Sequence, residues 1–103
     1  MSEVSLKAVV LQTLDDMKAN DVAELSVSDR TSMTDWMIIA SGTSSRHVKS
    51  IAESVEFEAK QSGFRAIGIE GSEDGEWVLV DFGDVIVHVM QADTRAFYDL
   101  ESL

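Results

Sequence analysis

The side chains best suited to chemistry lie in residues 41–47, where four hydroxyl groups precede an arginine and a histidine in the run Ser-Gly-Thr-Ser-Ser-Arg-His. This run separates an apolar segment from a helix-like pattern, and such a junction can bind phosphate through backbone N–H groups and the helix dipole. It is not a P-loop, because the Gly-x-x-x-x-Gly-Lys-Ser/Thr pattern is missing. Capping of the helix by Ser41–Ser45 accounts for the same residues and is the interpretation we favour.

The other catalytic and metal-binding patterns are weaker. His47 falls in the first turn of the helix, where the dipole disfavours a protonated ring, so we expect a neutral hydrogen-bonding residue rather than a catalytic base. Asp81 and Asp84 resemble a carboxylate pair for a metal ion, but Asp84 is better explained as a turn residue. The sequence has no Gly-x-Ser-x-Gly elbow and no cysteine. We therefore expect no metal, no cofactor and no enzymatic activity.

Length and composition indicate one globular domain over residues 1–103. The chain is long enough for a single core, and 45% of its residues are hydrophobic. No apolar run reaches the length of a membrane span, and the N-terminus lacks the basic and apolar regions of a secretory signal. A cytoplasmic location is the expectation that follows.

The charge is strongly negative and unevenly distributed. The formal net charge is -11, which disfavours DNA binding and leaves contact with ribosomal RNA peripheral at most, because phosphate backbones are repelled. Residues 66–94 hold seven acidic residues and no lysine or arginine. This acidic window is either a solvated surface that aids solubility or a surface matched to a basic partner.

Hydrophobic periodicity and turn residues predict an α+β domain in the order αββαβββα, with about five strands in a mixed sheet, two main helices and a short C-terminal helix. Asp93 and Thr94 are expected to cap the last helix, from which Phe97, Tyr98 and Leu100 would pack back. The expected elements are helices over 5–20, 45–62 and 95–101, and strands over 23–28, 36–40, 64–69, 77–82 and 85–90.

The last two strands form a hairpin whose two sides differ in character. If Gly83 and Asp84 form a two-residue turn, Phe82 pairs with Val85 and one side carries only Val and Phe side chains. A three-residue loop over residues 82–84 would shift the pairing but would not change which residues within each strand share a face. Those residues are the natural contact for the helices: Val78, Val80, Phe82, Val85, Val87 and Val89. The other side combines apolar, acidic and imidazole groups, which is typical of a binding surface.

We predict that this second side binds a partner through Trp77, Leu79, Asp81, Asp84, Ile86, His88 and Met90. Tryptophan is enriched at the centres of protein interfaces, and methionine repacks readily against a partner. Two alternatives use the same residues. The final helix of the chain would cover them, or a second copy of the chain would, giving a homodimer when the protein is free.

Four stretches in the same order resemble the Iojap family, the bacterial ribosomal silencing factors. Together they extend over nearly the whole chain, and their combination is specific although each alone is weak. They are residues 34–47 (TDWMIIASGTSSRH), 71–77 (GSEDGEW), 80–88 (VDFGDVIVH) and 95–101 (RAFYDLE). Trp36 departs from the pattern, because the family usually has tyrosine there.

The resemblance implies a ribosomal silencing factor that binds the large ribosomal subunit through ribosomal protein fourteen, which is basic. Occupying that site would block association with the small subunit and repress translation when nutrients are limiting. The resemblance also implies a nucleotidyltransferase-like fold. Residues 41–45 are a partial match to the Gly-Ser helix start of that superfamily, whereas its paired strand acids are absent. A nucleotide-binding protein or enzyme relic centred on residues 41–47 is therefore the alternative function.

Overall fold

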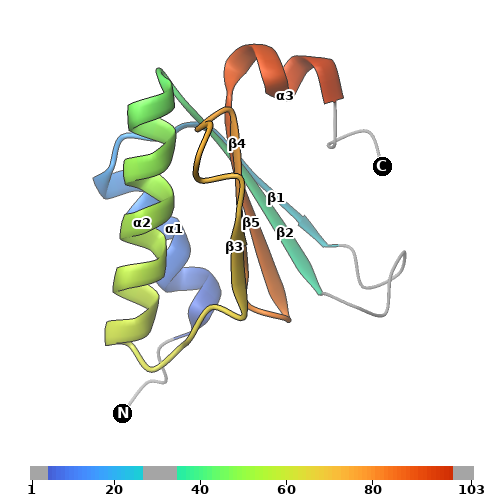
Figure 1. The fold of residues 1–103 in the computed structure, drawn as a ribbon. Helices are drawn as coiled ribbons and strands as arrows, with labels where there is room; N and C mark the ends of the chain where they lie inside the picture. The colour runs from blue at the N-terminus through green and yellow to red at the C-terminus, as the bar shows by residue number, and fades with distance from the viewer. Residues whose placement is uncertain (1–4, 27–34, 99–103) are drawn as a thin grey trace.

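The computed structural model describes residues 5–26 and 35–98, which form one α+β domain in the predicted order αββαβββα (Figure 1). Serine N-caps open both long helices, and the one at α2 belongs to the hydroxyl-rich run predicted to cap it. The elements are α1 (Leu6–Asp16), β1 (Asn20–Ser26), β2 (Trp36–Gly42), α2 (Ser45–Gln61), β3 (Gly68–Glu70), β4 (Trp77–Asp81), β5 (Val85–Gln91) and α3 (Ala92–Tyr98).

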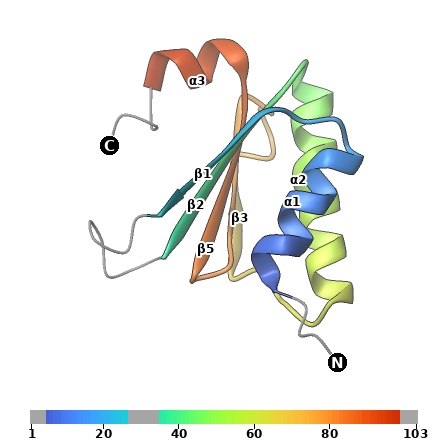
Figure 2. The ribbon, with the colours of Figure 1, turned by 180° about the vertical axis from the view of Figure 1, so that it is seen from behind.

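The five strands form one mixed sheet in the order β1-β2-β5-β4-β3. β2 and β5 are parallel, and the other neighbouring pairs are antiparallel. Helices α1 and α2 cover one face of the sheet, while α3 lies at the end of the sheet on the opposite side (Figures 1 and 2). We call the face away from α1 and α2 the second face.

The core lies between the sheet and the two long helices. The apolar residues Val48, Ile51, Ala52, Val55 and Ala59 of α2 recur at helical spacing, and all five are buried against the sheet. All six hairpin residues predicted to face the helices belong to this core or pack against it. The buried cluster comprises Val10, Leu14, Ile38, Ala40, Val48, Ile51, Ala52, Val55, Val78, Val80, Val85, Val87 and Val89.

Helix α1 begins where the sequence predicts and ends earlier. The Ser5 hydroxyl accepts the Ala8 N–H at 3.1 Å and so caps the start of the helix. The predicted end at residue 20 is wrong, because Lys18 adopts a left-handed φ of 59° and the helix is capped at Met17. This early end lets β1 start at Asn20 instead of at the predicted residue 23. The end of that predicted strand and most of the polar segment after it fall within residues 27–34, which lie outside the described residues.

Two further predicted boundaries are also corrected. The strand predicted over 64–69 is reduced to Gly68–Glu70, because Phe64 still closes α2 by donating its N–H to the Ala59 carbonyl at 2.8 Å. Helix α3 starts at Ala92, directly after β5, so Asp93 and Thr94 lie inside it rather than capping it. Phe97 is 81% exposed, so its predicted packing is wrong, and residues 99–101 lie outside the described residues.

Candidate functional site on the second face

The hairpin register is the one that the two-residue turn predicts. Phe82 donates its N–H to the Val85 carbonyl at 2.9 Å across the turn at Gly83 and Asp84. Along the strands Trp77 pairs with Met90. Because directly paired residues share a face, this register brings the predicted partner-binding residues of β4 and β5 together on the second face.

Burial divides the seven predicted residues. The side chains of Trp77, Leu79, Asp81 and Ile86 are half-buried, and Asp84 in the turn is exposed. His88 is only 6% exposed and Met90 is fully buried. These two side chains therefore offer little surface for direct contact in the free protein. The partner-binding role of all seven residues stays a prediction.

Trp77 and His88 are connected by a hydrogen bond across the hairpin. The Trp77 Nε1–H donates to His88 Nδ1 at 3.0 Å, and the two ring centroids are 5.8 Å apart at an angle of 44°. Because Nδ1 accepts, the neutral imidazole carries its proton on Nε2. Burial lowers the pKa of His88 to about 4, since a charged ring would lose its hydration.

The two aspartates of the hairpin shape its turn. Asp81 Oδ1 accepts the Gly83 N–H at 2.8 Å, which stabilises the bend between β4 and β5. The Asp84 carbonyl accepts the N–H groups of Asp35 and Trp36 at 3.0 Å each, so the same turn also holds the start of β2. Among the described residues no three His, Cys, Asp or Glu side chains gather to hold a metal ion.

The hydroxyl-rich segment at residues 41–47 serves to cap and brace the fold. Ser44 Oγ accepts the His47 N–H at 3.1 Å and is the N-cap of α2. His47 Nδ1 accepts the Thr43 N–H at 2.9 Å, which makes Nε2 the donor to the Met17 carbonyl at 2.9 Å. His47 thus joins the start of α2 to the end of α1, in agreement with the predicted neutral hydrogen-bonding residue.

Beside this segment lies a crevice of about 460 Å³ at the carboxyl ends of the parallel strands β2 and β5. Such a position commonly binds ligands in open α/β sheets. The lining here contains two carboxylates and no basic side chain, which is a poor environment for a phosphate. The lining residues are Asn20, Asp21, Ser41, Gly42, Thr43, Gln91, Ala92 and Asp93.

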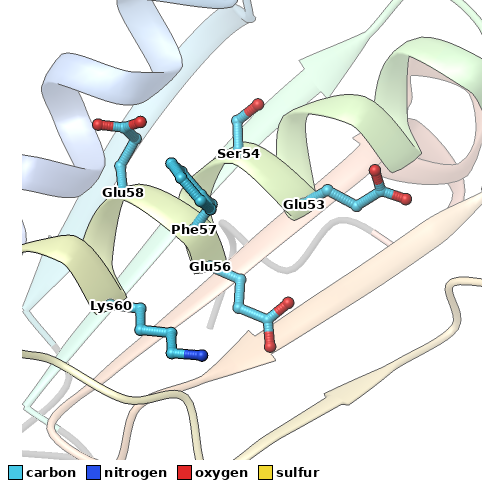
Figure 3. A pocket seen from close by; sticks show the side chains of 6 residues that line it. All are labelled: Glu53, Ser54, Glu56, Phe57, Glu58 and Lys60. Carbon is cyan, nitrogen blue, oxygen red and sulfur yellow. The ribbon is translucent and has the colours of Figure 1, made fainter.

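On the side of the molecule away from the second face, the outer surface of α2 carries a hollow of about 470 Å³ (Figure 3). Its lining comes from this one helix, and the side chains of Phe57, Glu56 and Glu58 project away from one another. Phe57 is 58% exposed. Because α2 lies across the sheet from the second face, this surface provides matched control positions for tests of the second face.

Several second-face residues are missing from the sequence prediction because they come from other strands. Glu70 of β3 pairs with Leu79 and is exposed, so it adds a carboxylate to the second face. Ile39 of β2 pairs with His88 and is fully buried. Residues 36–40 are a continuous apolar run, and residue 70 lay outside the strand predicted over 64–69, so neither the faces of these strands nor the order that places β2 beside β5 was visible in the sequence.

Helix α3 is fixed at one end of the second face. Arg95 Nη1 donates to Ser41 Oγ at 3.0 Å, and this bond ties the helix to the end of β2. The predicted alternative, in which the final helix covers the partner-binding residues of the hairpin, stays a prediction. Within the described residues no helix is long and apolar enough to cross a membrane.

Fold and site together define a class of small α+β protein, in which two helices cover one sheet face and the opposite face carries Trp77 together with the carboxylates of Glu70 and Asp81. The chain belongs to the family described as "Ribosomal silencing factor during starvation", which it matches over residues 2–103.

Known relatives share most of this chain. The ribosomal silencing factor of Chromobacterium violaceum is 46% identical over 95% of this chain and 80% of its own length. That of Haemophilus influenzae is 42% identical over 97% of this chain and 98% of its own length. A mouse protein named "Mitochondrial assembly of ribosomal large subunit protein 1" is 32% identical over 92% of this chain and 43% of its own length.

The fold is also that of a solved relative. A crystal structure of a Chromobacterium violaceum protein superposes with a TM-score of 0.94 at 44% identity, over 99% of this chain and 85% of the other. A structure from Bacillus halodurans gives a TM-score of 0.85 at 36% identity, over 94% of this chain and 90% of the other.

Proposed function

We propose that the protein binds the large ribosomal subunit through its second face, with the basic ribosomal protein fourteen as its partner there. Bound in this way, it sterically prevents the small subunit from joining and so represses translation when nutrients are limiting. Occupancy of the site is sufficient for this effect, so the proposal needs no catalysis and places the protein in the cytoplasm with the ribosomes.

The single observation that supports this proposal best is the composition of the second face. Half-buried Trp77 and Leu79 lie beside the exposed carboxylate of Glu70, within a window of seven acidic residues that has no lysine or arginine. An amphipathic aromatic side chain, here Trp77, with a carboxylate nearby, here Glu70, complements a basic protein surface. The names of the bacterial relatives and of the mouse relative add support, because they connect the family with ribosome silencing and with the large subunit.

Co-sedimentation with purified large subunits tests the proposal, followed by a subunit-joining assay in sucrose gradients. We expect Trp77→Ala to cost about 2 kcal/mol of binding, roughly thirtyfold in Kd. Phe57→Ala is the matched control, because it removes a more exposed aromatic from α2 on the other side of the molecule. The proposal fails if the two variants bind large subunits equally well.

Charge reversal gives an independent test of the role of the Glu70 carboxylate on the second face. Glu70→Lys on the second face should weaken binding strongly, whereas Glu56→Lys on α2 should weaken it little, although both change the net charge equally. Binding of the unmodified protein should also decrease as salt rises, because exposed charges are screened. Equal losses in the two variants would mean that net charge, and not the second face, attracts the ribosome.

Nucleotide binding at residues 41–47 remains the alternative function, and the crevice at the ends of β2 and β5 is the observation that favours it. The acidic lining of that crevice and the capping roles of Ser44 and His47 weigh against it. Calorimetry with nucleoside triphosphates and magnesium separates the two functions. Saturable binding that Arg46→Ala abolishes would favour the alternative, and sedimentation of the free protein would test the predicted homodimer.

A further inference from the structure

The Trp77–His88 pair on the second face supports an inference that rests on the proposed function and specifies its chemistry. The two residues are diagonal neighbours, because Trp77 is paired with Met90 and His88 with Leu79. Their hydrogen bond of 3.0 Å runs between side chains of adjacent strands. The indole is therefore fixed by a partner that is itself held in the sheet.

His88 is built into its position. It is 6% exposed and lies between its strand partners, Leu79 on β4 and fully buried Ile39 on β2. An imidazole in such a place is fixed by packing, so Nδ1 is a stationary acceptor. A stationary acceptor limits the rotation of the Trp77 side chain, which lowers the entropy lost when a partner binds.

The hydrogen bond also determines what Trp77 offers to a partner. Its N–H is occupied by His88 Nδ1, so a partner that presents a carbonyl or carboxylate gains no hydrogen bond there. The indole ring itself attracts cations through its negative face. Glu70 lies on the same face, opposite Leu79 on the neighbouring strand, and supplies a carboxylate that would pair with such a cation.

We propose that His88 is a positioning residue that holds the Trp77 indole so that its ring receives an arginine or lysine side chain of the ribosomal partner, with Glu70 as the counter-charge. His88 acts through Trp77 and does not touch the partner. The second face thus recognises a cationic side chain by its ring surface and carboxylate together.

The positioning role is tested without the ribosome. Proton NMR of the indole N–H groups, assigned with Trp36→Phe, should show the Trp77 signal protected from exchange with water. His88→Leu should remove this protection, and His88→Asn should restore part of it, because the amide oxygen returns an acceptor near the position of Nδ1. The positioning role is overturned if His88→Leu leaves the exchange of the Trp77 N–H unchanged while the variant stays folded.

The second measurement is the affinity for purified large subunits. We expect His88→Leu to bind about tenfold more weakly and His88→Asn to recover part of the loss. An unmodified protein that fails to bind large subunits refutes the proposed function, while the exchange experiment still decides the role of His88. A protein that binds and loses affinity in Trp77→Ala, but not in His88→Leu, refutes the positioning role alone.

The cationic nature of the contact needs its own comparison. Trp77→Phe keeps an aromatic ring and Trp77→Leu keeps only apolar bulk, and neither retains the indole N–H. If a cation lies on the ring, the leucine variant should bind large subunits about tenfold more weakly than the phenylalanine variant. Equal affinities of the two variants would show that Trp77 contributes apolar area rather than a cation-binding ring.

Discussion

Acid should destabilise this fold through His88. The ring is nearly inaccessible to water, and burial lowers its pKa from 6.5 to about 4. Below pH 6.5 the unfolded chain takes up a proton on this residue, whereas the folded chain stays neutral until about pH 4. The free energy of unfolding therefore falls as the pH drops through this window, is at its full value above it, and falls no further below it.

The size of the effect follows from the pKa difference. Each pH unit inside the window removes about 1.4 kcal/mol of stability, so the whole interval is worth on the order of 3 kcal/mol. Small domains have about 5–15 kcal/mol of stability in total. The loss from this one side chain is thus a substantial fraction of that total, and chemical denaturation measures it readily.

Urea unfolding followed by tryptophan fluorescence, at several values between pH 7.5 and pH 4, is the assay. The asparagine in His88→Asn does not titrate, so its free energy of unfolding should change with pH less steeply by about 1.4 kcal/mol per unit within the window. Comparing slopes cancels the contribution of the carboxylates, which both proteins share. Trp77→Phe should keep the steep slope, because burial rather than the indole bond lowers the pKa. Identical slopes in the unmodified protein and His88→Asn would refute the reasoning.

Two further predictions use paired substitutions. Gly71→Ala should lower stability by about 2 kcal/mol or more, because Gly71 has a φ of +85° and an added Cβ would lie 2.0 Å from the Trp77 carbonyl oxygen. Gly68→Ala is the control and should change the melting temperature little, because an added Cβ there meets nothing within 4 Å. Similar melting curves for the two variants would contradict the strain expected at Gly71. Ile51→Ala should lower the free energy of unfolding in urea by about 2–5 kcal/mol, because Ile51 is fully buried. Ile67→Ala should lower it by under about 0.5 kcal/mol, because Ile67 is 72% exposed. Equal losses in the two variants would refute this burial pattern.

The sequence was sufficient for the hairpin because its information is local. Alternation with period two assigned Val78 and Val80 to the helix side, and the Gly83-Asp84 turn set the register that the structure shows. The α2 stripe was predictable for a similar reason, because its apolar residues repeat at the helical period over 17 residues. In both cases neighbours in the sequence are also neighbours in the fold.

The errors arose where distant parts of the chain decide the local structure. At the end of α1, His47 of α2 donates from Nε2 to the Met17 carbonyl, and the helix ends there with Lys18 in a left-handed conformation. The parallel pairing of β2 with β5 brings Ile39 against His88, and that pairing depends on strand order, which periodicity does not encode. The sequence therefore divided the hairpin correctly into a core side and a second side, but it overestimated the exposure of His88 and Met90.

The burial of a polar His88 side chain supports the proposal that the second face binds a partner. A buried position between Leu79 and Ile39 is one where an apolar side chain would fill the space without an acid-sensitive cost. The imidazole lowers stability in acid, but unlike leucine it provides a hydrogen-bond acceptor for the Trp77 N–H. Sequences depart from the stable choice mostly where a site requires it. The fold therefore gives up stability at low pH at the same residue that orients the aromatic ring proposed to bind the ribosome.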